Sequence, residues 1–167
     1  MPWDGTLENL PMLVIPAGTE LHHGTDCAGD FEIPDGPAWF ASTHEVAAEW
    51  AGWNYPAHDR ADGERRTHAH VTLADLRLVD LDAVQAVEDG WDRLCLAVAG
   101  IDDELTREEL AAAFAQRGLA GWAGEEELLI VSPDKVLRFV GRIPVPGENP
   151  LRPVPSTYLP PAAGLAA

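Results

Sequence analysis

Three short segments of the sequence carry side chains suited to ligand binding and catalysis. One pairs two imidazoles with a glycine, one places aromatic rings before two hydroxyls, and one begins with three carboxylates. They are residues 21–25 (LHHGT), 36–43 (GPAWFAST) and 125–130 (EEELLI). An imidazole can hold a polar ligand, an aromatic ring can stack on a planar group, and a carboxylate can stabilise positive charge that develops in a transition state. We therefore consider the three segments jointly, as candidate parts of one site.

In this order, with a helical region between the second and the third, the segments resemble the ADP-ribosyltransferase superfamily. The resemblance covers residues 12–142. Members of this superfamily break the bond between nicotinamide and ribose in NAD and transfer ADP-ribose to an acceptor. The resemblance implies an α+β fold with a split β-sheet core and flanking helices, and it implies NAD as the cofactor.

The matching residues combine features of two branches of the superfamily. A strand that ends in His-Gly-Thr, with a stacking aromatic residue further on, is typical of the diphtheria-toxin-like and poly(ADP-ribose)-polymerase-like branch. An aromatic-x-Ser-Thr-Ser motif and a Glu-x-Glu pair are typical of the cholera-toxin-like branch, whose arginine before Gly24 is absent here. The resemblance implies NAD contacts from His23, Gly24, Thr25, Trp39 and Ser42, with Trp39 in the place of a tyrosine, and catalytic roles for Glu127 and Glu125.

The chemistry of NAD cleavage gives the glutamates distinct expected roles. Departure of nicotinamide leaves an oxocarbenium-like sugar, which the carboxylate of Glu127 would stabilise. Since side chains alternate along a strand, we expect Glu125 on the same face as Glu127, where it would orient or deprotonate the acceptor, and Glu126 on the opposite face. The expected activity is that of a mono-ADP-ribosyltransferase or an NAD glycohydrolase, with a protein side chain or a small molecule as acceptor.

Each segment also has a purely structural interpretation. Runs of glutamate before a strand are usually solvated turns, aromatic residues such as Trp39 and Phe40 are more often core, and Ser42 and Thr43 suit the cap of a helix. His68 and His70 are two residues apart and are expected on the same face of a strand. Together with His58 or Cys27 they could form a zinc site. Their spacing matches no compact zinc signature, so we expect no metal.

Composition limits the classes of partner. The chain has 167 residues, 28 acidic and 11 basic, with a formal net charge of −17. Such a charge repels phosphate backbones, so nucleic acid is a less favoured partner. It suits a competing hypothesis, a non-enzymatic acidic module that engages a basic or inhibitory protein partner.

The sequence has neither a long apolar run nor an N-terminal signal pattern. We therefore expect no membrane span, and either a cytoplasmic protein or one exported without a signal peptide. Cys27 and Cys95 are expected to be free thiols.

The hydrophobic pattern predicts an α+β domain at 1–143 and a Pro-rich extended or disordered tail at 144–167. Residues 11–25 are expected to form an apolar run, a Pro-Ala-Gly turn and a short strand ending at Gly24. Further strands are expected within 68–80, as one strand or a pair, and at 128–131 and 136–140, the last two joined by a Ser-Pro-Asp-Lys turn. The expected helices are 42–52, 82–87 with Asp82 as cap, 91–99, and one after Thr106 that Gly118 closes. The last has a capping box, Thr106 with Glu109, and is the best-defined element.

Overall fold

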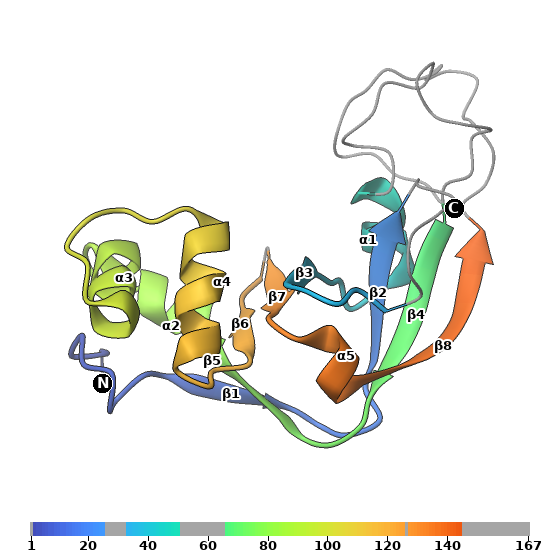
Figure 1. Cartoon of the computed structure of the whole chain (residues 1–167), viewed down its shortest axis with the longest axis horizontal. Helices are drawn as coiled ribbons and strands as arrows, with labels where there is room; N and C mark the ends of the chain where they lie inside the picture. The colour runs from blue at the N-terminus through green and yellow to red at the C-terminus, as the bar shows by residue number, and fades with distance from the viewer. Residues whose placement is uncertain (1, 26–32, 51–65, 126, 145–167) are drawn as a thin grey trace, which may run out of the picture.

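The structure, a computed structural model, describes residues 2–25, 33–50, 66–125 and 127–144. It contains two β-sheets with helices beside them, which confirms the α+β class (Figure 1). The five-stranded sheet has the order β1-β5-β6-β7-β3, with bounds Met12–Ile15, Leu76–Asp80, Gly121–Ala123, Leu128–Ile130 and Ala38–Trp39. The three-stranded sheet has the order β2-β4-β8, with bounds Glu20–Thr25, Arg66–Thr72 and Leu137–Pro144.

The helices are divided between the two sheets. Helices α2 (Leu81–Gln85), α3 (Gly90–Ala99) and α4 (Arg107–Gln116) connect β5 to β6 and lie together at one end of the molecule (Figure 1). Helix α1 (His44–Trp50) lies against β2 and β4, where the His44 ring is 2.7 Å from the Thr67 hydroxyl oxygen. The short helix α5 (Pro133–Val136) precedes β8. β5 and β6 pair in parallel, an arrangement that requires a long crossover connection, and α2, α3 and α4 form that connection.

Two hydrophobic clusters hold these layers together. The helix-side cluster lies between α2–α4 and the five-stranded sheet and includes Trp122, Phe114 and Leu94, all fully buried. The inter-sheet cluster combines side chains of the five-stranded sheet with Leu21 and Leu137 of the three-stranded sheet. Adjacent residues of a strand point to opposite faces, so β7 contributes to both clusters. The two sheets are therefore packed on each other, and helices α2–α4 cover the far face of the larger one.

Several local expectations are confirmed. The capping box at the start of α4 has both of its hydrogen bonds. Thr106 Oγ1 accepts from the Glu109 backbone N–H at 3.1 Å, and Glu109 Oε1 accepts from the Thr106 N–H at 2.9 Å. Gly118 follows the helix with a φ of 72°, the left-handed conformation expected after a helix end. Phe40, 1% exposed, belongs to the inter-sheet cluster, as its core interpretation predicts.

Other local expectations are wrong. Asp80, not Asp82, caps α2 by accepting from the Ala83 N–H, because the helix begins directly after β5. The Ser-Pro-Asp-Lys segment enters α5 instead of forming a simple turn, since Pro133 occupies a first-turn position that needs no N–H donor. Strand β8 continues to Pro144, one residue into the expected tail, and residues 145–167 lie outside the described part of the chain.

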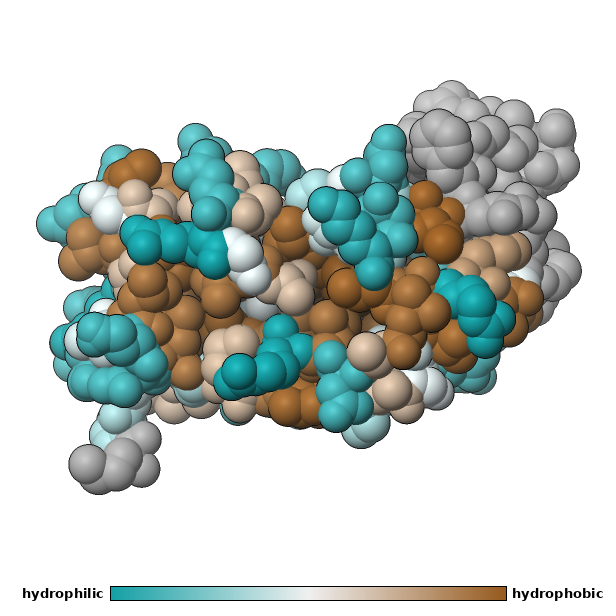
Figure 2. Space-filling model, turned by 60° about the horizontal axis from the view of Figure 1, so that its bottom comes forward, coloured by the Kyte–Doolittle hydropathy of each residue, from teal (hydrophilic) through white to brown (hydrophobic). Residues whose placement is uncertain are grey.

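One face of the molecule has an apolar middle. Figure 2 shows hydrophobic side chains gathered across the middle of this face, with hydrophilic side chains among and around them. Exposed large hydrophobic residues of the described chain include Val14 on β1 and Leu73 just after β4. Within the same described residues, no helix has both the length and the apolar character needed to cross a membrane.

Candidate active site

The strand pairing brings the three sequence segments side by side. β3 pairs antiparallel with β7, with Trp39 opposite Leu129, and the Phe40 N–H donates to the Leu128 carbonyl at 2.9 Å. On its other side, Ala41 exchanges two backbone hydrogen bonds of 2.8 Å with His22 of β2. The segment 38–41 is thus held between the strand that carries His23 and the strand that follows Glu127.

His23 is oriented by the backbone of β3. Its Nδ1 lies 2.8 Å from the carbonyl oxygen of Trp39, and because a carbonyl only accepts, Nδ1 is the donor. The imidazole also packs on Phe40, with ring centroids 5.6 Å apart. Gly24 and Thr25 continue β2 opposite Thr67 and Arg66. The expected ligand-binding imidazole therefore has a defined orientation next to Trp39.

Trp39 and Glu127 meet through a third residue, Trp122. The Trp39 ring stands edge-on to the Trp122 ring, with centroids 6.2 Å apart. The indole N–H of Trp122 donates to Oε2 of Glu127 at 2.9 Å. The other oxygen, Oε1, accepts from Nη2 of Arg107 at 3.0 Å, and the Glu127 side chain remains 21% exposed.

Glu125 does not share a strand face with Glu127. Gly124 N–H donates to the Glu127 carbonyl at 2.7 Å, directly after the pair Ala123 and Leu128. Because β6 ends at Ala123 and β7 begins at Leu128, Glu125 and Glu127 both lie outside these strands. The Glu125 N–H binds the carboxylate of Asp82, and its side chain is exposed. The expected shared face is wrong because alternation holds only in extended strands. Glu126 lies outside the described residues.

Thr43, the second of the two hydroxyl residues before α1, has the capping role that its residue type suggests. Thr43 Oγ1 accepts from the Val46 N–H at 3.3 Å in the first turn of α1. Ser42 is exposed and lies one residue beyond the bridge between Ala41 and His22. Ser42 therefore lies at the edge of the joined segments, between Trp39 and α1.

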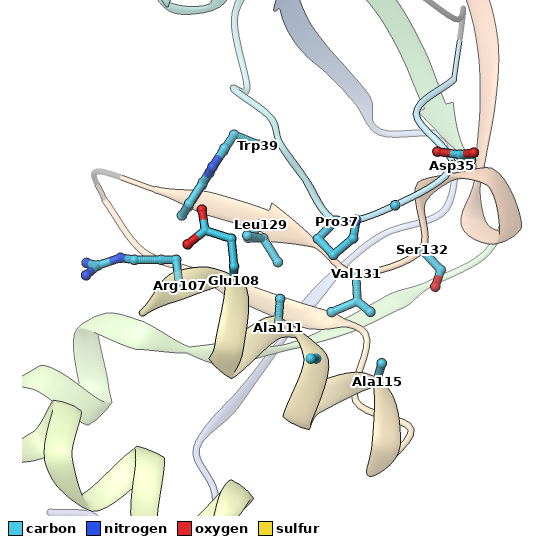
Figure 3. Close-up of a pocket in the computed structure, with 12 residues that line it drawn as sticks. Asp35, Pro37, Trp39, Arg107, Glu108, Ala111, Ala115, Leu129, Val131 and Ser132 are labelled. Atoms are coloured by element: carbon cyan, nitrogen blue, oxygen red, sulfur yellow. The ribbon is translucent and has the colours of Figure 1, made fainter. Parts of the chain in front are cut away.

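A hollow of about 540 Å³ opens beside Trp39. Its walls are mainly apolar and come from the segment before β3, from β7 and from the alanine face of α4, as Figure 3 shows. They include Pro37, Trp39, Ala111, Ala115, Leu129 and Val131. Polar atoms at its margin belong to Asp35, Arg107, Glu108 and Ser132. This volume lies within the range of small-molecule sites, and a mainly apolar wall with a few polar groups is their usual composition.

The remaining histidines pack within the three-stranded sheet. His68 and His70 share a face of β4, as alternation predicts, and both rings pack on Phe139 at centroid distances of 5.6 and 5.8 Å. The other residues considered for a zinc site, His58 and Cys27, lie outside the described residues. Among the residues that the structure does describe, no group of three His, Cys, Asp or Glu side chains could hold a metal ion.

In the described part of the chain, burial shifts the pKa values of His22 and Cys95. Burial lowers the pKa of His22, although the nearby Glu20 carboxylate opposes the shift. Burial raises the pKa of the Cys95 thiol, which is a free cysteine in the helix-side cluster. A thiol of this kind is a poor nucleophile.

Arg107, Trp91 and Trp122 were not among the expected site residues. Arg107 follows a helix cap, where a charged residue is usually solvated, and the sequence predicts no strand at 121–123. The one available signal was the unusual number of tryptophans, six in the chain. Aromatic residues with an N–H group often bind a polar partner when buried.

Comparison with known proteins reveals no relative of this chain: no protein-family model matches it, and neither does any curated protein or solved structure. The functional interpretation therefore depends on the motifs and on the geometry of the site.

Proposed function

We propose that the protein binds NAD and cleaves its nicotinamide–ribose bond, transferring ADP-ribose to an acceptor or to water. The observation that supports this proposal is the chain of contacts through the three motif segments. His23 binds the backbone of Trp39, and the Trp39 ring contacts Trp122, which donates to Glu127. Segments far apart in sequence are thus adjacent, and of the motif residues His23, Trp39 and Glu127, Trp39 lines the hollow.

The residues around Trp39 fit such a ligand. The hollow is large enough for a substantial part of a dinucleotide, and Trp39 offers it a flat aromatic surface. NAD would supply the glycosidic bond that breaks and nicotinamide as the leaving group. Trp39 would stack on nicotinamide and exclude water, and His23 would hold the dinucleotide.

Glu127 would stabilise the positive charge that develops on the ribose. A carboxylate has about four lone-pair positions, and Arg107 and Trp122 use one on each oxygen, so further positions remain for a substrate. The negative charge acts mainly in the transition state, since only there does the sugar carry substantial positive charge.

The proposal is tested by incubating the purified protein with NAD and measuring released nicotinamide. Glu127→Gln should lower the rate by roughly 100- to 1,000-fold, as expected when a transition-state contact is lost. Glu88→Gln is the matched control, because Glu88 is exposed and distant in sequence from the motifs. The proposal fails if the wild-type protein neither binds NAD nor releases nicotinamide, or if Glu127→Gln turns over NAD normally.

The acidic-module hypothesis remains the alternative. It is favoured by the net charge of −17 and by the internal partners of both Glu127 oxygens, which give this carboxylate a structural role without any substrate. Its expected result is binding to a basic protein that weakens steeply with salt and is unaffected by NAD. Competition by NAD would contradict it.

A further inference from the structure

The start of helix α4 places a cation beside the proposed catalytic carboxylate. Arg107 is the first residue of α4, and its Nη2 donates to Oε1 of Glu127 at 3.0 Å. Its guanidinium carbon lies 4.3 Å from the centre of the Trp91 ring, within the range of a cation–π contact. The guanidinium is therefore fixed by an aromatic surface as well as by its anionic partner.

The second partner of the carboxylate is still more constrained. Trp122 is fully buried, and its ring has edge-on neighbours in Phe114, Trp91 and Trp39 at centroid distances of 5.0, 6.1 and 6.2 Å. Its indole N–H consequently has little freedom to follow a moving carboxylate. Two donors of fixed position on two different oxygens leave Glu127 little rotational freedom.

The Arg107–Glu127 ion pair is poorly suited to a mainly stabilising role. The two side chains are 42% and 21% exposed, and ion pairs with this much solvent access add little to the stability of a fold. The capping box formed by Thr106 and Glu109 already holds the start of α4. The more specific effect of the pair is on the orientation of the carboxylate.

We propose that Arg107 is a positioning residue that, with Trp122, orients the Glu127 carboxylate for cleavage of the nicotinamide–ribose bond. This inference rests on the proposed function. Although Arg107 also lies at the margin of the hollow, its guanidinium is held by Glu127 and Trp91. Its main effect is therefore on the orientation of Glu127, and so on the chemical step more than on the binding of NAD.

Kinetics of nicotinamide release test this role. Arg107→Met should lower kcat about 10- to 100-fold while KM changes little, because displacement of a catalytic group by about 1 Å can cost 10²-fold. Arg107→Lys should recover part of this loss, since it restores one donor and the charge but not the planar fork. Added guanidinium ion should partly restore the activity of Arg107→Ala. Arg93→Met, which removes an exposed arginine from α3, is the matched control and should behave as wild type.

A readout without turnover separates this inference from the proposed function. The indole N–H of Trp122 gives an NMR resonance that can be assigned by its loss in Trp122→Phe. That resonance should shift in Arg107→Met and stay in place in Arg93→Met, because only the first frees the carboxylate that it contacts. An active wild type with unchanged kcat in Arg107→Met overturns the positioning role. An unchanged indole resonance overturns it as well, even if the wild type proves inactive, whereas inactivity with a shifted resonance refutes only the proposed function.

Discussion

Replacing Gly121 by alanine should damage the part of the sheet that carries Trp122. Gly121 has a φ of 145°, in a region that side chains rarely occupy, and it pairs with Ile130 of β7. A Cβ atom there would lie 1.9 Å from the Leu129 carbonyl oxygen and 3.0 Å from its carbon. Because these atoms are backbone, a side chain cannot rotate away, and the two strands must separate.

Two costs add up in this substitution. The backbone conformation alone costs a residue with a side chain about 1–3 kcal/mol. Moving the strands apart weakens at least one backbone hydrogen bond, which costs about 1 kcal/mol more. We therefore expect a loss of about 3 kcal/mol in the free energy of unfolding, a large part of the ~5–15 kcal/mol typical of a domain.

Equilibrium urea denaturation followed by tryptophan fluorescence measures this loss. Gly118→Ala is the matched control, because Gly118 has a φ of 72° but nothing lies within 4 Å of its added Cβ. The control should lose only about 1 kcal/mol, the cost of the left-handed conformation. Equal losses in the two variants would refute the reasoning, because they would mean that the contact with Leu129 contributes nothing.

Three further predictions concern stability. Thr106→Ala should reduce the free energy of unfolding by about 1 kcal/mol in urea denaturation, while Thr106→Ser, which keeps the hydroxyl of the capping box, should not; equal losses would contradict this. Leu78→Ala, at a fully buried position, should cost about 2–5 kcal/mol by the same measurement, against less than about 0.5 kcal/mol for the half-exposed Leu96→Ala. Because burial lowers the pKa of His22, the unfolded chain binds the proton more readily, and stability should fall as pH drops below 6.5. Urea midpoints at several pH values should decline less in His22→Gln than in wild type, and parallel curves would show that His22 does not contribute.

The elements with strong local signals were predictable from sequence. The box at Thr106 and Glu109 located α4, and the alternation around His68 and His70 located β4, because both signals arise within a few residues of chain. β3 and β6 were missed, since they have two and three residues and are strands only through their partners. Their pairing with β7 is a long-range property that no local pattern records.

In the candidate site too, features with a local sequence signal were predictable and features that depend on long-range contacts were not. The residue types at His23, Trp39 and Glu127 indicate a ligand site from the sequence alone. The sequence does not indicate the partners of Glu127, because Arg107 lies 20 positions away and Trp122 lies on β6, a strand that no local pattern predicts. Because neither Glu125 nor Glu127 lies in a strand, side-chain alternation gives no basis for pairing them. Hydrogen-bond partners depend on tertiary packing, which the spacing of residues in one segment cannot specify.

The alternation of the chain between the two sheets has a consequence for cooperativity. Along the described chain, the steps from β1 to β2, β2 to β3, β3 to β4, β4 to β5 and β7 to β8 each lead from one sheet to the other. Neither sheet can therefore be cut out as one continuous fragment, and the inter-sheet cluster draws on both. The two sheets should lose structure together in a single all-or-none transition. Although the molecule has two sheets, it should behave in solution as one unfolding unit, and the strands that join His23 to Trp39 and Glu127 should persist until the whole domain unfolds.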